Sequence, residues 1–402
     1  MKRREFLQSS MAMAAGAALP TLGAAAEPAS VGKPVVKSYR QLGKTAITMS
    51  DISFGAGKLA SASMILRAID QGVNYFDTAP DYGSSEALIG EAMTKFKQRD
   101  KIYIASKYCE AIPYPAHLAI GKSKADYIAA VDASLKRMNL DYLDVVFVHA
   151  IGEKSASVEQ EQQRLLDATM LEATEALKKA GKVRYLAVSS HGPNNLEPLL
   201  TTAVASGHYD IIMTAFNFMK FPQLPEVLKM AAARGVGIIA MKTLAGAKES
   251  QVEAGAAVFE HAAFRWVLKH PQIAGLVVTI KTVDDLNLYL QASGSSFAAA
   301  DQQALDLYAA RHGQNYCRTG CGDCMGSCPQ GVDIANILRY QMYFEDYGDE
   351  KRAMQSYAAL SHSASPCASC QQPSCTAACS HGLPVANKLQ AAHRTLSFTM
   401  VA

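Results

Sequence analysis

Two short runs of cysteine lie near the C-terminal end of the chain and together hold eight of its nine cysteines. The first run has the spacing C-x₃-C-x₂-C-x₃-C-P, and the second has the spacing C-x₂-C-x₄-C-x₃-C. Their members are Cys317, Cys321, Cys324 and Cys328 in the first run and Cys367, Cys370, Cys375 and Cys379 in the second. Three thiolates this close together can bind three irons of one cubane, while a fourth thiolate from elsewhere binds the last iron. The two runs therefore predict two 4Fe-4S clusters and a protein that moves electrons.

Two other kinds of cysteine site are alternatives. Structural zinc prefers two well-separated C-x₂-C pairs, whereas the sulfurs here are bunched in threes. Disulfides form in exported proteins, and the N-terminus of this chain indicates export. The spacing favours clusters over both alternatives. Cys109 lies outside both runs, and a single cysteine of this kind is typically a buried thiol.

The first residues of the chain resemble an export signal of the twin-arginine type. Arg3-Arg4 is followed by Phe6-Leu7 and by a weakly apolar stretch at residues 10–19, which is too short to span a bilayer. Three alanines then supply small residues for cleavage before Glu27, so residues 1–26 are expected to be a signal peptide. An unprocessed basic N-terminus is the alternative. The twin-arginine route exports folded proteins with their cofactors in place, so the expected location is the periplasm.

The composition limits the size and the partners of the protein. The chain has 402 residues, of which 49% are hydrophobic, so one large core and a small appended domain can both form. The formal net charge of +3 falls close to neutral without the basic presequence, and no basic block is present, so no nucleic acid partner is expected. No transmembrane segment is expected in the mature chain, because no later stretch is long and apolar enough.

Short apolar runs alternate with longer amphipathic segments between residues 35 and 312. The expected strands are Ile52–Phe54, Val73–Asp77, Ile102–Lys107, Leu143–His149, Val183–Ser189, Ile211–Phe216, Gly237–Met241 and Gly275–Ile280. Most are near-continuous apolar runs, as in strands buried on both faces. Helical periodicity lies between them, at Ser84–Phe96, Lys124–Met138, Arg164–Ala180 and Ala256–Lys269. Eight such units predict an α/β fold of the (β/α)₈ TIM barrel type. A doubly wound sheet is the alternative, but its G-x-G-x-x-G turn is missing.

The periodicity breaks after Gly313, and residues 313–402 are expected to form a second domain. A helical segment follows each cysteine run, at Val332–Phe344 and Leu383–Leu396, and a helical insert lies around Gly348–Leu360. The sequences C-P-Q-G-V-D-I-A-N-I-L and C-S-H-G-L-P-V-A-N-K-L repeat one another. This duplication resembles that of two-cluster ferredoxins, in which the fourth cysteine of a run often serves the other cluster. We therefore expect a small helical two-cluster ferredoxin-like domain.

Four residues that could transfer or direct a proton follow successive strands of the expected barrel. Asp77 closes the second strand, Tyr82 lies in the loop after it, and Lys107 and His149 close the third and fourth. Because chemistry collects at the C-terminal ends of barrel strands, all four should face one mouth. A lysine cation about 4 Å from the phenol would lower the pKa of Tyr82 by about 3 units from about 10. Tyr82 would then act as a general acid, and His149 would polarise a carbonyl oxygen.

Longer segments around these residues resemble the aldo/keto reductase family. The resemblance is carried by residues 72–86, which include Asp77 and Tyr82, and by residues 39–45, 143–149, 181–185 and 264–268. It covers the expected barrel, and the complete chain is similar to the branch of the family with a C-terminal ferredoxin-like domain. The resemblance implies that Asp77, Tyr82, Lys107 and His149 are the catalytic tetrad, and that NADP or NAD binds across the barrel mouth.

The resemblance also implies which residues bind this cofactor. Ser189 and Ser190 match the residues that hold the carboxamide, and Phe216 matches the ring that stacks on the nicotinamide. The whole expected set is Gly55, Ser189, Ser190, Phe216, Met241, Lys242, Leu244 and Lys281. Asparagine and glutamine are common in the family where this chain has Ser190 and Met213.

A further departure concerns the 2′-phosphate of the cofactor. Asp284 and Asp285 follow Lys281, in a place where basic residues usually bind this phosphate. Because carboxylates repel a phosphate and suit a free 2′-hydroxyl, the sequence leaves the choice between NADP and NAD open.

The expected function is an oxidoreductase that interconverts a carbonyl and an alcohol on a small substrate, with an external partner exchanging electrons through the clusters. The alternative is a nucleotide-binding redox sensor or electron relay without carbonyl reductase turnover. The Pro-rich loop Ile112–Ile120 after Lys107 is the expected wall of the substrate pocket. The identity of the substrate is not encoded in any motif.

Overall fold

The computed structural model describes residues 33–112, 114, 116–153, 157–192, 195–219, 224–245, 257–318 and 321–397. The signal peptide expected at residues 1–26 lies outside the described residues. Residues from Pro34 onward belong to one compact unit. Within the described part of the chain, no helix combines the length and the apolar character needed to cross a membrane.

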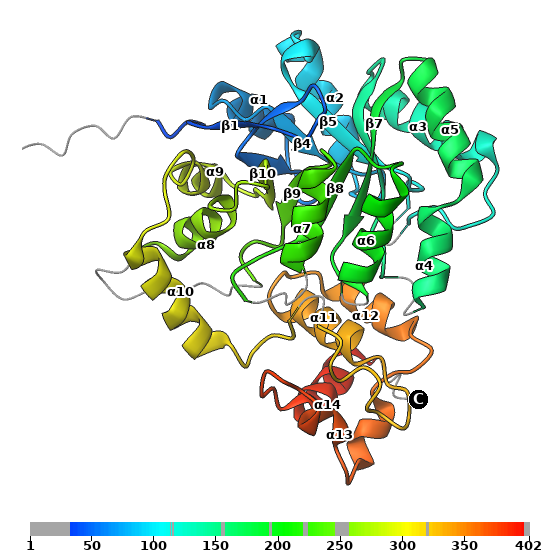
Figure 1. The fold of residues 1–402 in the computed structure, drawn as a ribbon, viewed down its shortest axis with the longest axis vertical. Coiled ribbons are helices and arrows are strands. Elements are labelled where there is room, and N and C mark those ends of the chain that lie inside the picture. The colour runs from blue at the N-terminus through cyan, green and yellow to red at the C-terminus, as the bar shows by residue number, and fades with distance from the viewer. Residues whose placement is uncertain are drawn as a thin grey trace, which may run out of the picture. The chain divides into compact units, whose positions relative to one another are not determined.

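The described residues form a closed barrel of eight parallel strands, with helices packed around its outside (Figure 1). The strands follow the order β10-β3-β4-β5-β6-β7-β8-β9 around the barrel. They are β3 (Ile52–Gly55), β4 (Tyr75–Asp77), β5 (Tyr103–Lys107), β6 (Leu143–Val148), β7 (Val183–Ser190), β8 (Ile211–Ala215), β9 (Gly237–Met241) and β10 (Gly275–Thr279). Val146 packs in the core shared with the helices, whereas Phe147 packs inside the barrel. The predicted (β/α)₈ barrel is confirmed.

A short antiparallel hairpin precedes the barrel. It consists of β1 (Tyr39–Gln41) and β2 (Thr48–Ser50). Leu42, Ile47 and Met49 of the hairpin join the cluster that fills the barrel interior. Gly43 has a φ of +56°, and a Cβ there would lie 2.4 Å from the backbone nitrogen of Gly237. Glycine is therefore needed where the hairpin turn meets β9.

Helices connect the strands and shield their outer faces. They are α1 (Ala62–Asp70), α2 (Ser85–Phe96), α3 (Lys124–Met138), α4 (Val158–Leu165), α5 (Ala168–Lys179), α6 (Leu196–Ser206), α7 (Leu224–Ala233), α8 (Phe259–Leu268), α9 (Val283–Leu290) and α10 (Ala299–His312), with the short 3₁₀ helix η1 at Arg99–Lys101. The single helix predicted at Arg164–Ala180 was wrong, because two helices share this segment. Asp167 accepts hydrogen bonds from the backbone N–H groups of Thr169 and Met170 and so begins α5.

The cysteine-rich segment folds as a group of helices with its own core. These are α11 (Ile334–Glu345), α12 (Glu350–Ala358), the 3₁₀ helix η2 (Ser365–Ser369), α13 (Ser374–Ala377) and α14 (Val385–Leu396), drawn in orange and red in Figure 1. Ile337, Leu338 and Leu389 are among the residues of this core, and Cys367 and Cys375 are buried in it. The helices expected after each cysteine run and in the insert are therefore present.

Candidate active site

The four predicted catalytic residues line one cavity of about 790 Å³. Asp77 and Lys107 end β4 and β5, and His149 directly follows β6. Tyr82 lies in the loop between β4 and α2. Parallel strands bring their C-terminal ends to the same edge of the barrel, so residues far apart in the sequence meet there.

Lys107 is held in place by two oxygen atoms. Its Nζ atom donates to Asp77 Oδ1 at 2.7 Å and to the backbone oxygen of Thr78 at 2.8 Å. Both side chains of the ion pair are almost fully buried. Burial raises the pKa of Asp77 above its ordinary value, while the neighbouring Lys107 opposes this shift. The positive charge of Lys107 is therefore shared with Asp77 before it can act on any third group.

Tyr82 differs from the sequence expectation in its acidity. The Nζ atom of Lys107 lies 5.2 Å from the centre of the Tyr82 ring, so a lysine does adjoin the phenol. Burial nevertheless raises the pKa of Tyr82 well above 10, and the charges of Asp77 and Asp81 raise it further. The predicted lowering was wrong, because it left out the loss of hydration and the second carboxylate. In this structure Tyr82 is a neutral phenol that can donate its proton.

His149 is neutral and presents one ring nitrogen without a partner. Burial lowers its pKa well below 6.5, and the positive charge of Lys107 lowers it further. Its Nδ1 atom lies 3.2 Å from the Sγ atom of Cys109 and 3.8 Å from Oδ2 of Asp81. Its Nε2 atom is buried and has no hydrogen-bond partner among the described residues. His149 is thus arranged to hydrogen-bond a group in the cavity.

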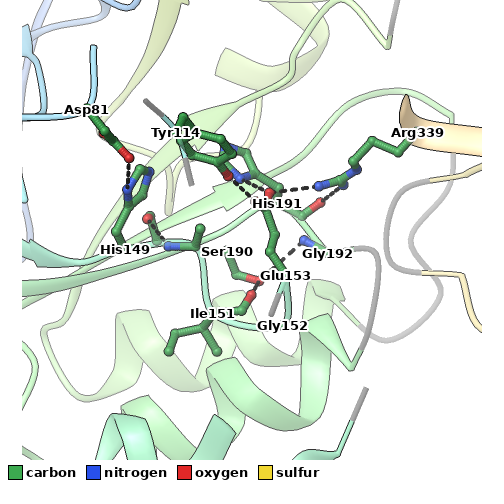
Figure 2. Close-up of polar contacts among 12 residues, drawn as sticks. Asp81, Tyr114, His149, Ile151, Gly152, Glu153, Ser190, His191, Gly192 and Arg339 are labelled. Atoms are coloured by element: carbon green, nitrogen blue, oxygen red, sulfur yellow. Dashed lines mark hydrogen bonds and ion pairs between the residues drawn. The ribbon is translucent and has the colours of Figure 1, made fainter. Parts of the chain in front are cut away.

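Asp81 adjoins this histidine and was not singled out in the sequence. Burial raises its pKa to about 6, although a hydrogen bond from the Ala116 backbone opposes the shift. Figure 2 shows its carboxylate directed at the His149 ring. Asp81 directly precedes Tyr82, and this adjacency was the one signal in the sequence that pointed to it.

A second polar network lies beside His149 and joins the barrel to α11 (Figure 2). Glu153 accepts from Arg339 Nη1 at 2.9 Å and from the Tyr114 hydroxyl, and one of its oxygens lies 2.5 Å from His191 Nδ1. Arg339 Nη2 also donates to the backbone oxygen of His191 at 2.8 Å. Burial opposes ionisation of Glu153, but His191 and Arg339 together hold its pKa well below its ordinary value. Burial lowers the pKa of His191 to about 4, so this ring is neutral.

The C-terminal helices supply part of the cavity wall. Tyr343, Tyr347 and Arg352 line the cavity together with the barrel residues. The ammonium group of Lys242, after β9, lies 5.3 Å and 5.0 Å from the ring centres of Tyr343 and Tyr347. No motif predicted that these C-terminal residues would line the cavity, because the strongest sequence signals in their segment are the cysteine runs. The loop expected as a pocket wall does contribute, through Ile112 and Tyr114.

Six of the eight predicted cofactor-binding residues line the same cavity. They are Gly55, Ser189, Met241, Lys242, Leu244 and Lys281. Phe216 is instead buried against Trp266 and His270, with ring centres 5.1 Å and 5.0 Å away. Ser190 is also buried and donates to the backbone oxygen of Ile151 at 2.9 Å. The structure therefore does not bring Phe216 or Ser190 to the cavity wall.

The carboxylate of Asp285 has a structural role at the start of α9. It accepts hydrogen bonds from the backbone N–H groups of Lys281 and Thr282 at 3.0 Å and 2.9 Å. This is a capping box with Thr282 as the N-cap. Asp285 accordingly serves the helix, while its charge stays next to Lys281.

The eight clustered cysteines gather into two sets of four. Burial raises the pKa of Cys317 to about 12, and the thiols that act on it are those of Cys324, Cys321 and Cys379. Burial likewise raises the pKa of Cys367 to about 11, and the thiols that act on it are those of Cys328, Cys375 and Cys370. The fourth cysteine of each run therefore acts mainly on thiols of the other run, and Cys375 of the second run also acts on Cys324 of the first. All nine cysteines are described, and none is in a disulfide.

Known proteins match the barrel part of this chain. The sequence model of the aldo/keto reductase family matches residues 56–259, which is half of the chain. The chain belongs to the aldo/keto reductase family. An aldo-keto reductase from Melia azedarach, named for 7-acetyl-epi-neemfruitin B, is 33% identical over 40% of this chain and 52% of its own length. The 6-dehydroglucose reductase of Novosphingobium aromaticivorans is 26% identical over 61% of this chain and 86% of its own length.

Other relatives extend the same likeness. L-galactose dehydrogenase of Arabidopsis thaliana is 27% identical over 51% of this chain, and the match spans 65% of that relative. A solved structure of a candidate aldo-keto reductase from Pseudomonas aeruginosa has a TM-score of 0.53 and 25% identity, and the match covers 69% of this chain and 98% of the other. In its matches to several relatives, this aldo/keto reductase chain spans only about half to two thirds of the length of the relative.

Proposed function

We propose that this protein is an oxidoreductase that interconverts a carbonyl group and an alcohol by hydride transfer with NAD(P)(H). In the proposal Tyr82 is the general acid and base, and two 4Fe-4S clusters in the C-terminal domain couple the reaction to electron transfer in the periplasm. The observation that carries the proposal is the convergence of Tyr82, Lys107 and His149 on one cavity. The names of the relatives describe reductases and a dehydrogenase, which are the two directions of such a reaction.

The cavity suits a nicotinamide dinucleotide. Lys242 and Lys281 bring positive charge to its wall, where the phosphates would need it. Gly55 also lines the cavity, and a Cβ there would lie only 3.0 Å from the backbone oxygen of Val278, so glycine fits best where β3 packs against β10. When bound, NAD(P)H supplies the hydride that converts a carbonyl carbon to an alcohol.

The proton chemistry follows from the described side chains. Tyr82 is protonated, so it can give a proton to the carbonyl oxygen as that oxygen gains negative charge. Lys107, fixed by Asp77 and Thr78, stabilises the tyrosinate left behind. The free Nε2 side of the His149 ring can hydrogen-bond the same oxygen and polarise the carbonyl. In the alcohol-to-carbonyl direction, Tyr82 takes the proton back.

The two sets of cysteines support the proposal of two clusters. Each set offers four thiols, which is the number that a cubane cluster requires. The exchange of fourth cysteines between the runs matches the arrangement in two-cluster ferredoxins. Each cluster carries one electron at a time, so the pair can hold the two electrons that a hydride carries. An external redox protein would exchange those electrons with the exposed side of this domain, where Cys370 is exposed.

The proposed location rests on the twin-arginine segment at the N-terminus. Soluble nicotinamide nucleotide is scarce outside the cytoplasm. The protein would therefore be exported with its nucleotide already bound, or would receive electrons through the clusters. Cell fractionation tests this: the wild type should be in the periplasmic fraction, and a variant with Lys at positions 3 and 4 should stay in the cytoplasm.

Anaerobic purification of the full chain tests the enzymatic proposal. The purified protein should show the visible absorption of iron–sulfur clusters, should carry nucleotide or accept it, and should oxidise NAD(P)H with an added aldehyde. The absence of both nucleotide binding and nicotinamide-dependent turnover would contradict the proposal.

Replacing Tyr82 by Phe tests the assigned acid separately. The Tyr82→Phe variant should bind nucleotide normally but lose at least about 100-fold in kcat, the usual effect of removing a general acid. Undiminished carbonyl reduction would show that Tyr82 is not the acid, and would favour a nucleotide-binding electron relay.

A further inference from the structure

A cation from the C-terminal domain reaches the cavity of the barrel. Arg352, on α12, lines this cavity, and its side chain is 30% exposed. Its guanidinium carbon lies 3.8 Å from the ring centre of Tyr114 and 4.6 Å from that of Tyr343. The two aromatic rings pack against the faces of the planar guanidinium. Its N–H groups point outward from the edge of this plane, where they can donate to a ligand.

Arg352 lacks the strong partners that such a group usually has. Its nearest carboxylate is Asp349, at 3.7 Å, and its buried Nε atom has no hydrogen-bond partner in the described part of the chain. Arg339, by contrast, donates to Glu153 and to the backbone of His191 at hydrogen-bond distances of 2.9 Å and 2.8 Å. A buried N–H group without a hydrogen-bond partner costs free energy unless a ligand takes that bond.

Asp349, the carboxylate nearest to Arg352, does not serve this arginine alone. Asp349 is also ion-paired with Lys58, and Lys58 lines the cavity as well. Two cations therefore share one carboxylate. Of the other acidic groups that line the cavity, Asp77 is paired with Lys107. Asp346 and Asp81 are the remaining ones, and the pKa of Asp81 is raised to about 6 by burial, so its negative charge is incomplete in mildly acidic solution.

Arg352 also lies close to the proposed reacting groups. Its charge acts on both Tyr82 and Asp81, where it opposes the rise in their pKa values. Arg352 and Tyr82 line the same cavity of about 790 Å³, so a ligand that contacts both has to fit inside it. The planar N–H edge of a guanidinium matches a carboxylate, which it can bind through two parallel hydrogen bonds.

We infer that Arg352 binds a carboxylate of the substrate, so that the natural substrate class is small carbonyl compounds that also carry a carboxylate, such as oxo acids and aldehyde acids. The inference rests on the proposed carbonyl–alcohol activity and adds a specificity-determining residue to it. It also gives the C-terminal domain a second role, because that domain completes the substrate pocket of the barrel.

Paired substrates test the inference in the cluster-loaded enzyme. Succinic semialdehyde and butanal have four carbons each and differ in the carboxylate. The wild type should favour succinic semialdehyde in kcat/KM, and Arg352→Gln should lower kcat/KM for it by about 10- to 100-fold, mainly through KM, because a charge-assisted hydrogen bond is lost. Turnover of butanal should fall much less than turnover of succinic semialdehyde, and Arg352→Lys should restore part of the difference between the two aldehydes. Equal losses for both aldehydes, or a wild-type preference for butanal, would overturn the inference.

The matched control is Lys351→Gln. Lys351 is the exposed neighbour of Arg352 on α12 and is not among the residues of the cavity wall, so the variant removes the same charge without touching the pocket. Both aldehydes should be reduced by this variant as by the wild type. If Lys351→Gln lowered kcat/KM for succinic semialdehyde as much as Arg352→Gln does, the effect would come from the overall positive charge of α12. That result would contradict a direct contact between Arg352 and the substrate.

Calorimetric titration with succinate separates this inference from the proposed function. Succinate should bind the wild type and should bind Arg352→Gln at least about 10-fold more weakly. Arg352-dependent binding without turnover of either aldehyde would refute the carbonyl–alcohol activity and leave the carboxylate site standing. Turnover of butanal with no Arg352-dependent binding of succinate would refute the site and leave the activity. Tighter binding of inorganic phosphate than of succinate would also overturn the assignment to carboxylates.

Discussion

The Sγ atom of Cys109 lies 3.2 Å from Nδ1 of His149, inside the wall of the cavity. Burial raises the pKa of the Cys109 thiol well above its ordinary value, so the sulfur keeps its proton. Burial also keeps the His149 ring neutral. If the Cys109 thiol donates its hydrogen bond to Nδ1, the neutral ring carries its own proton on Nε2, which has no partner among the described residues. In that arrangement the ninth cysteine favours the form of His149 that can donate to a carbonyl oxygen.

Replacing Cys109 by Ala should weaken catalysis without removing it. Loss of the thiol donor lets the proton of His149 move between its two nitrogens, and kcat should fall about 3- to 10-fold, the equivalent of one ordinary hydrogen bond. Cys109→Ser keeps a donor and should retain most of the activity. Nitrogen-15 NMR of His149 should show a protonated Nε2 in the wild type and in Cys109→Ser only. Equal kcat values for the Ala and Ser variants would contradict the assigned tautomer.

Asp81 should make the stability of the protein depend on pH between about 4 and 6. Its pKa is raised to about 6 in the folded state, against about 4 for a hydrated aspartate. The folded state thus binds this proton more tightly than the unfolded state does. The stabilisation is complete below pH 4 and is lost as the pH rises through about 6. Two pH units correspond to about 3 kcal/mol of unfolding free energy.

Comparing the wild type with the Asp81→Asn variant at each pH isolates the contribution of Asp81 to stability. Urea unfolding should show that the unfolding free energy of the variant, relative to that of the wild type, rises by about 2–3 kcal/mol between pH 4 and pH 7. The comparison cancels the titration of other carboxylates, some of which change in the opposite sense, as Glu153 does. A difference in unfolding free energy that does not vary with pH would show that Asp81 titrates like a surface aspartate.

The barrel could be predicted from the sequence because its physical signal is local. A strand buried on both faces needs an unbroken apolar run, and Leu143–Val148 is fully buried along its whole length. The ends of those runs also located Asp77, Lys107 and His149, since a parallel strand delivers its last residue to the mouth. The boundary between α4 and α5 was not predicted, because the hydrophobic periodicity continues across it. Asp167 caps the N-terminus of α5 at this point and so separates the two helices.

Features that depend on distance between segments could not be predicted in this way. The acidity of Tyr82 depends on how deeply the phenol is buried and on the neighbouring Asp81, neither of which a spacing encodes. Arg352 belongs to a segment whose strongest signal is cysteine, yet its side chain faces Tyr114 in a barrel loop. The wall of the cavity is assembled from the barrel and from the C-terminal helices, and only the folded chain shows this.

Glu153 should be a major link between the barrel and the C-terminal helices. Its carboxylate is almost fully buried and neutralises Arg339 of α11, while the Tyr114 hydroxyl donates to it and His191 Nδ1 lies beside it. Glu153→Ala would leave the buried Arg339 without its counter-charge and should destabilise the folded protein by about 3–5 kcal/mol. Urea denaturation would measure the loss, and limited proteolysis should find earlier cleavage in the segment between the two domains.

A surface pair gives the control for this prediction. Glu91 and Lys95 lie one turn apart on α2, both more than half exposed, with 2.6 Å between their charged atoms. Glu91→Ala should therefore change the unfolding free energy by at most about 0.5 kcal/mol. Similar small effects of the two substitutions would mean that the network around Glu153 does not hold the domains together.

The grouping of cysteines predicts how iron is lost when single thiols are removed. Cys379 lies with Cys317, Cys321 and Cys324, whereas Cys328 lies with Cys367 and the rest of the second run. If each set binds one 4Fe-4S cluster, Cys379→Ala and Cys317→Ala should damage the same cluster, although the two residues belong to different runs. Both variants should fall from about eight irons per chain to about four, with the same change in the paramagnetic-resonance spectrum of the reduced protein.

The double variant makes this prediction decisive. Cys317→Ala combined with Cys379→Ala should lose no more iron than either change alone, whereas Cys317→Ala combined with Cys328→Ala should lose both clusters. Cys109→Ser, which removes the one cysteine outside the two sets, should keep all the iron, since its thiol contacts His149 and lies in the barrel. Loss of both clusters in the first double variant would show that each run binds its own cluster. About two tightly bound zinc ions per chain, or no metal at all, with no iron, would remove the clusters from the proposal, because the same thiols would then serve a structural metal or no metal.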